Sequence, residues 1–90
     1  MNTENLKIRQ ILTLAYENHR KSNLKLAESL YNKILKIDPN HTDTIFLLGT
    51  LFLQKKKFQN AIELFHKVLA INPNHVNAIH NLGFASIEIG

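Results

Sequence analysis

The chain has 90 residues, enough for one small domain and too few for two independent hydrophobic cores. Its hydrophobic fraction of 44% is typical of globular proteins, and no apolar run approaches the ~20 residues of a membrane-spanning helix. Eleven Lys and Arg against seven Asp and Glu give a net charge of +4, and the absence of cysteine excludes disulfides and thiolate metal sites. Because the amino terminus lacks the basic start and apolar stretch of a secretory signal, we expect a cytoplasmic protein.

Apolar residues recur at helical spacing in segments that are separated by short polar breaks. In one of these segments Ile45, Leu48 and Phe52 fall on a single helix face, and the polar run Lys55-Lys56-Lys57 ends it. The pattern predicts five helices, at about 4–20, 24–36, 42–54, 58–70 and 75–88.

Two prolines mark the ends of the second and fourth predicted helices. Pro39 and Pro73 lack the amide donor that a helix needs and clash with the preceding turn, so neither helix continues past them. A hydroxyl or amide side chain soon after each proline can cap the next helix, and we expect Thr42 and Asn74 to do so.

The chain also repeats itself. The segment Asp38-Pro39-Asn40-His41 recurs 34 residues later as Asn72-Pro73-Asn74-His75. The same shift aligns apolar positions along the chain, namely Ile11 with Ile45, Leu14 with Leu48, Ala27 with Ala61, Leu30 with Leu64 and Leu35 with Leu69. Two full periods, 8–41 and 42–75, are followed by a half period, 76–90. This self-similarity predicts an all-α solenoid of helix-turn-helix repeats, about two and a half in number.

Small residues occupy the positions where the two helices of a repeat would cross. Ala15 would meet Ala27 in the first repeat, and Gly49 would meet Ala61 in the second. A glycine inside a helix costs about 1 kcal/mol relative to alanine, so a close approach of two backbones is the expected reason for Gly49.

These positions resemble the signature of the tetratricopeptide repeat family over residues 8–90. In the second period the matching residues are Ile45-x2-Leu48-Gly49-x2-Phe52, then Ala61-x3-Phe65, then Pro73. In the first they are Ile11-x2-Leu14-Ala15, then Ala27-x3-Tyr31, then Pro39. The repeat sequences are most similar to those of the N-terminal arrays of bacterial tetratricopeptide repeat proteins, including those similar to O-GlcNAc transferase. The resemblance implies a single repeat domain over 1–90, the N-terminal part of a longer array, with a non-catalytic protein-binding role.

In this family the first helices of successive repeats line a concave groove that holds partner peptides. By resemblance, the partner-binding residues here would be Leu12, Tyr16, Phe46, Leu47, Thr50, Leu53, Asn77, Asn81 and Phe84. The middle of this set is apolar, which suits an amphipathic helix or an extended apolar peptide. The Lys and Asn residues of the family's carboxylate clamp are missing, and only Asn81 matches the asparagine ladder of the O-GlcNAc transferase-like arrays.

No arrangement of residues in the chain predicts chemistry. His41 and His75 lie one repeat apart, and stacked repeats would separate them by roughly 10 Å, too far to share a metal ion. A glycine-rich phosphate loop is missing, and Ser29 and Ser86 fall inside helices instead of a nucleophile elbow. We therefore expect no enzyme activity, no cofactor and no metal.

Two alternatives to peptide binding remain open. The last helix is apolar where a capping helix would be polar, because it carries Ile79, Leu82, Phe84, Ile87 and Ile89. This helix could make the chain an oligomerisation module, with a homodimer through residues 76–90. Nucleic-acid binding is the weaker alternative, since the three lysines of 55–57 fall short of a basic 5–8-mer and are interpreted as a solvated turn.

Overall fold

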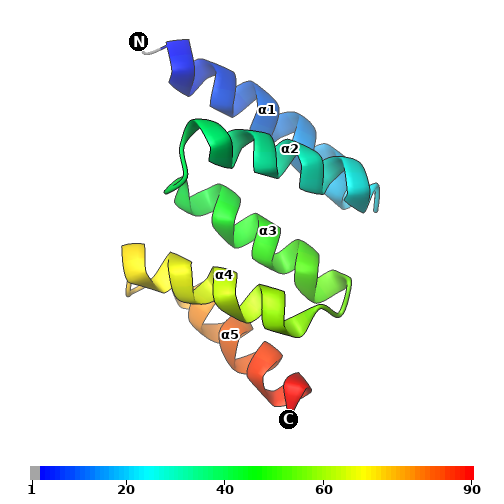
Figure 1. Cartoon of the computed structure of the whole chain (residues 1–90), viewed down its shortest axis with the longest axis vertical. Helices are drawn as coiled ribbons and strands as arrows, with labels where there is room; N and C mark the ends of the chain where they lie inside the picture. Colours follow the sequence, from blue (N-terminus) through cyan, green and yellow to red (C-terminus); the bar gives the residue numbers. More distant parts are fainter. Residues whose placement is uncertain (1–2) are drawn as a thin grey trace.

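The computed structural model describes residues 3–90 and contains five helices and no strand within that range. The helices are α1 (Thr3–Arg20), α2 (Leu24–Ile37), α3 (Thr42–Gln54), α4 (Phe58–Ile71) and α5 (Val76–Ile89). Each predicted helix is confirmed, and its bounds differ from the observed ones by one residue at most. The helices stack into an elongated solenoid of 43 × 28 × 18 Å, in which α2 and α4 cross in front of α1 and α5 (Figure 1).

The core consists of two clusters, each centred on one buried aromatic ring. The first joins α1, α2 and α3 around Tyr31, and the second joins α3, α4 and α5 around Phe65. Both rings are completely buried, as are the alanines that they pack against, including Ala27 and Ala61. Because α3 contributes to both clusters, it connects the two halves of the solenoid.

Gly49 allows α3 to pack closely against α4. A Cβ atom added at this position would lie 2.7 Å from Cε1 of Phe65, which is inside van der Waals contact. The glycine predicted to serve close packing therefore does so, against an aromatic ring in the partner helix. Gly83 lies one period later on α5, and a Cβ atom there would meet no atom within 4 Å.

The turn between α1 and α2 and the turn between α3 and α4 have the same geometry. Ser22 and Lys56 adopt positive φ values of 65° and 59°. The following residue then donates its amide hydrogen back across the turn, as Lys57 does to the carbonyl of Phe52 at 2.9 Å. This arrangement satisfies carbonyl groups that the helix end would leave unpaired.

The prediction that Thr42 and Asn74 cap their helices is wrong. The N-cap residues are His41 and His75, and Nδ1 of His75 accepts a hydrogen bond from the amide of Ala78 at 3.0 Å. Asn74 lies one residue before the N-cap position. Its backbone amide donates to Oδ1 of Asn72 at 3.2 Å, which closes a side-chain turn before the helix begins. The recurring histidines thus have a structural role at the helix starts.

Replacing each of the two helical glycines by alanine should have opposite effects on the stability of the fold. Gly49→Ala should destabilise the fold by about 1–2 kcal/mol, because the clash with Phe65 exceeds the gain in helix propensity. Gly83→Ala should stabilise it by up to about 1 kcal/mol, because only the gain in propensity remains. Urea denaturation followed by circular dichroism at low micromolar protein concentration measures both. A stabilising Gly49→Ala would contradict the packing role of that glycine.

Candidate partner-binding groove

The candidate site is built from matching stripes on α1 and α3. In α1 the residues Arg9, Thr13, Tyr16 and Arg20 follow a spacing of four, three and four, which keeps them on one helix face. A shift of one period gives the corresponding stripe of α3, formed by Asp43, Leu47, Thr50 and Gln54. The two stripes lie side by side because α1 and α3 contact each other directly.

A hollow of about 600 Å³ lies between these stripes. Its lining residues come only from α1 and α3 and are Arg9, Leu12, Thr13, Tyr16, Glu17, Arg20, Asp43, Phe46 and Leu47. Tyr16 is 47% exposed, whereas Leu12, Phe46 and Leu47 are half-buried. A smaller hollow of about 390 Å³ adjoins it and adds Thr50 and Gln54. Apolar side chains thus form the middle of the surface, and charged side chains flank it.

The structure brings together five of the nine residues predicted to bind a partner. Four of them, Leu12, Tyr16, Phe46 and Leu47, line the larger hollow, and Thr50 lines the smaller one. The remaining four, which line neither hollow, are Leu53, Asn77, Asn81 and Phe84. The binding role of all nine remains a prediction.

Several of these residues also hold the helices together. Leu53 packs in the core cluster around Phe65, and the Phe46 ring lies 5.8 Å from that of Phe65 and 4.8 Å from that of His75. On α5, Phe84 is 49% exposed and makes an edge contact with Phe58 of α4, with 6.5 Å between the ring centroids. Phe46 and Leu53 are therefore poor positions for testing partner binding, since their replacement would disturb the fold.

The sequence analysis missed a polar network at one end of the groove. Nδ1 of His19 lies 2.8 Å from the hydroxyl of Tyr31, and Nε2 lies 3.1 Å from Oε1 of Gln54. Because an amide oxygen only accepts, Nε2–H donates to Gln54 and Nδ1 accepts from Tyr31. The neutral imidazole therefore joins α1, α2 and α3. A sequence signal existed, since the positions one and two periods later hold the apolar residues Leu53 and Ile87.

Burial governs the protonation of this network. Removal from water lowers the pKa of His19 below its usual 6.5, and the hydrogen bond to Gln54 opposes that shift. Burial likewise raises the pKa of Tyr31 to about 12, with a smaller contribution from the charge of Tyr16. The Tyr31 hydroxyl therefore remains a hydrogen-bond donor at neutral pH.

The groove contains two threonine hydroxyls, and both are occupied by the backbone. Thr13 donates to the carbonyl of Arg9 at 3.0 Å, and Thr50 donates to the carbonyl of Leu47 at 2.7 Å. In the part of the chain that the structure describes, no three His, Asp or Glu side chains gather as metal ligands would. None of the helices between residues 3 and 90 is both long enough and apolar enough to cross a membrane.

Comparison with known proteins identifies the class of this fold. Residues 11–41 and 43–75 each match a family model described as the tetratricopeptide repeat. The chain belongs to the tetratricopeptide repeat family.

Among solved structures, the chain is similar to a mutant of the O-GlcNAc transferase of Thermobaculum terrenum. The TM-score is 0.88 at 24% sequence identity, and the match covers 94% of this chain and 16% of that one. At this identity the likeness shows the fold alone, a helical solenoid. A search of curated proteins gives no match.

The His19 network predicts that stability depends on pH. The folded state holds His19 with a lowered pKa, so the unfolded state binds its proton more readily. The contribution of His19 to the free energy of unfolding is therefore complete above its unfolded pKa of about 6.5 and declines as the pH falls through the folded pKa.

His19→Gln tests this expectation. Urea denaturation of the unchanged chain and the variant should show a stability difference that shrinks as the pH is lowered from about 7.5 to 5. His66→Gln on the exposed face of α4 is the matched control, because His66 lies outside the network. A difference between the unchanged chain and His19→Gln that stays constant over this pH range would contradict the role assigned to burial.

Proposed function

We propose that this chain is a non-catalytic scaffold that binds a peptide or an amphipathic helix in the groove between α1 and α3. Tetratricopeptide repeats generally mediate protein–protein interaction, and the chain contains two of them. The observation that carries the proposal is the hollow of about 600 Å³, because it combines an apolar floor with the half-exposed ring of Tyr16.

The charges at the edge of the hollow define the chemistry of its occupant. Arg9 and Arg20 line it together with Glu17 and Asp43, so its charged residues are balanced in sign. A balanced edge gives little preference for a strongly acidic or basic ligand, and contact with the apolar floor must supply most of the affinity. The best ligand is therefore a segment with two or three large apolar side chains, either helical or extended.

The chemistry of the groove supports a binding role. The Thr13 and Thr50 hydroxyls donate to backbone carbonyls, so neither is positioned by a general base as a nucleophile would be. The structural neighbour is an enzyme, but this chain matches only 16% of it, and we carry over none of its activity.

The proposal is tested by selecting peptides that bind the chain from a random displayed library. Enriched peptides should share large apolar residues, and Tyr16→Ser or Tyr16→Asp should weaken the binding of a labelled selected peptide by at least tenfold, as measured by fluorescence anisotropy. Each substitution removes the contact area of the half-exposed ring, and Tyr16→Asp also places a charge beside the apolar floor.

Leu26→Ser is the matched control for these variants. Leu26 is 50% exposed on α2 and lies outside both groove hollows, so its replacement should leave peptide binding within twofold. Selected peptides that bind the Tyr16 variants as tightly as the unchanged chain would overturn the proposal.

Self-association through α5 is the second candidate function, and a specific observation favours it. Val76, Ile79, Gly83 and Ile87 form one stripe of α5, which corresponds by the period to the stripe of α3 that α4 covers. Yet Val76 is 74%, Ile79 51% and Ile87 77% exposed, and nothing fills the space beside Gly83. Burying each large side chain in a dimer would contribute about 1.5–3 kcal/mol.

Light scattering over a dilution series tests this second function. We expect a dimer that dissociates on dilution, and we expect replacement of Ile79 and Ile87 by glutamine to shift the dissociation constant at least tenfold. The exposed Leu26→Gln on α2 should leave the dissociation constant unchanged. A chain that is monomeric at every concentration measured would rule out self-association.

A further inference from the structure

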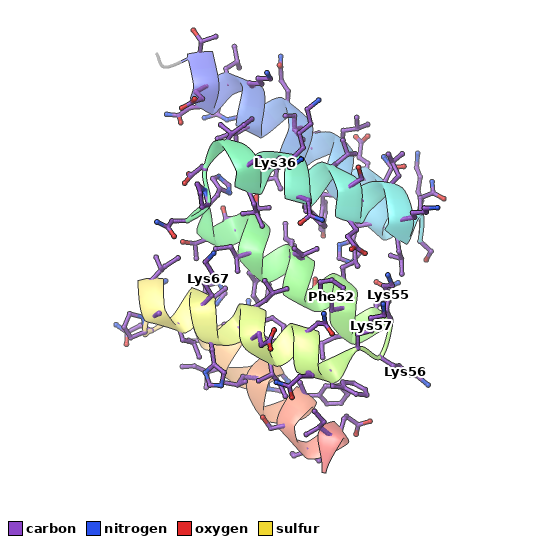
Figure 2. All side chains as sticks on the ribbon, in the orientation of Figure 1. Lys36, Phe52, Lys55, Lys56, Lys57 and Lys67 are labelled. Atoms are coloured by element: carbon purple, nitrogen blue, oxygen red, sulfur yellow. The ribbon has the colours of Figure 1, made fainter. Side chains whose placement is uncertain are left out.

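The positive charge of the chain is concentrated on one side of the solenoid. Residues 21–41 and 55–75, which comprise α2, α4 and their adjoining turns, contain eight of the eleven Lys and Arg residues but three of the seven Asp and Glu residues. Figure 2 shows Lys36 on α2, Lys67 on α4 and the lysines of 55–57 at the turn between α3 and α4. The rest of the chain therefore carries three basic and four acidic residues.

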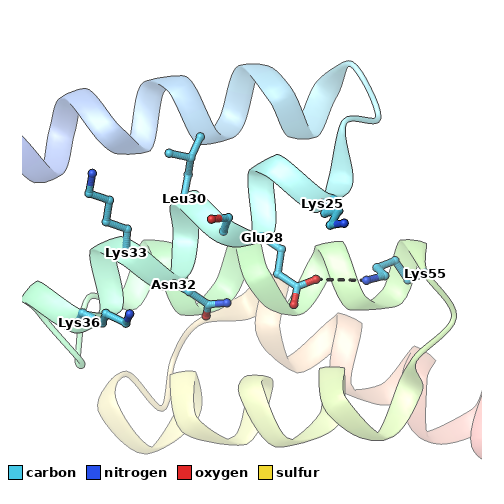
Figure 3. Close-up of a pocket in the computed structure, with 8 residues that line it drawn as sticks. Lys25, Glu28, Leu30, Asn32, Lys33, Lys36 and Lys55 are labelled. Carbon is cyan, nitrogen blue, oxygen red and sulfur yellow. Dashed lines mark hydrogen bonds and ion pairs between the residues drawn. The ribbon is translucent and has the colours of Figure 1, made fainter.

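A hollow of about 1030 Å³ lies on this basic side (Figure 3). We call it the lysine trough, and it is lined by Lys25, Glu28, Ser29, Leu30, Asn32, Lys33, Lys36 and Lys55. All of these except Lys55 come from α2, and Lys55 follows α3. The trough is separate from the groove, since the two hollows share no residue.

Most of the charge in the trough is not neutralised by the chain. Lys55 pairs with Glu28, with 3.1 Å between Nζ and Oε1. Lys25, Lys33 and Lys36 have no carboxylate in ion-pair distance among residues 3–90. Lys33 and Lys36 are also three residues apart, so their like charges are neighbours on the helix surface and repel each other. An anionic partner would convert this repulsion into attraction.

The spacing of the donors fits an extended polypeptide. Lys25, Ser29, Asn32 and Lys36 follow a spacing of four, three and four, so they form one stripe on α2. From the helical rise, the two ends of this stripe lie roughly 16 Å apart, a distance that about five residues of an extended chain span. The lysines at the ends suit carboxylates, and the hydroxyl and amide between them can bond to backbone carbonyls.

The aromatic residues argue for a polypeptide over a nucleic acid. No residue that lines the trough is aromatic. The nearby rings of Tyr31 and Phe65 are completely buried, and the Phe52 ring is half-buried with Nζ of Lys55 at 5.8 Å from its centroid. Single-stranded nucleic acids bind through base stacking on exposed aromatic side chains, which this surface does not offer.

We propose that the lysine trough is a second binding surface, independent of the groove, and that it takes an acidic segment of a polypeptide. The unneutralised lysines supply the attraction, and the donors between them match carbonyl groups of the bound chain. Affinity should therefore fall steeply with salt, because the charges are exposed to solvent.

The proposal is tested with fluorescein-labelled hexaglutamate, by fluorescence anisotropy at low ionic strength. Replacing Lys25, Lys33 and Lys36 together by glutamine should weaken binding at least tenfold. Glutamine keeps a helix propensity close to that of lysine, and circular dichroism should report an unchanged helix content. The matched control replaces Lys7, Lys21 and Lys67 by glutamine, which removes the same number of charges from exposed positions outside the trough and the groove. It should change binding by less than twofold.

Three results would overturn the proposal. The first is hexaglutamate that fails to bind at low ionic strength. The second is an equal loss of affinity in both triple variants, which would show a response to net charge alone. The third is a labelled six-nucleotide oligothymidylate that binds at least as tightly as hexaglutamate and depends on the same lysines, which would make a nucleic acid the ligand. Loss of peptide binding in Tyr16→Ser with unchanged hexaglutamate binding would separate the trough from the groove.

Discussion

The contact between the backbone at Gly49 and the ring of Phe65 is the constraint on which this solenoid depends. With 2.7 Å between the ring and a notional Cβ atom, only glycine lets α3 and α4 approach this closely. Ala15, Ala27 and Tyr31 form the corresponding small-residue and aromatic cluster in the first repeat. Once each pair of helices is fixed in this way, the remaining faces of α1 and α3 turn toward the groove, and α2 presents its lysines on the opposite side.

The sequence predicts the helices well because several independent signals agree. The repeat period, the polar breaks and the prolines all indicate the same boundaries, and every predicted bound lies within one residue of the observed one. The caps were missed because the side chains of Asp38 and Asn72 close a turn before each helix, so that His41 and His75 become the N-cap residues. The groove was only partly predictable, since a helical stripe does not reveal that Leu53 is turned into the core. Nor does it reveal that His19, at a position that is apolar in the other repeats, forms hydrogen bonds with Tyr31 and Gln54.

The groove and the lysine trough differ in the kind of interaction that would hold a partner. The groove has balanced charges and an apolar floor, so contact area would dominate the binding proposed there and salt would have little influence. The lysine trough has unneutralised charge, so long-range attraction would dominate binding there and salt would weaken it. A scaffold with both could hold two different segments of one partner, and the joint affinity would then exceed that of either segment alone.

The weak attachment of α5 has a consequence for the dynamics of the chain. Only two of its residues are buried, Ala78 and Ala85, and both have small side chains. The two buried residues of α1 include the larger Ile8, and α3 buries five residues. Elements with little buried surface open locally at a lower free energy than the rest of a protein. Backbone amides of α5 should therefore exchange with deuterium well before those of α3, through a fluctuation that leaves the first four helices folded. Local unfolding of the solenoid is therefore expected to begin at α5.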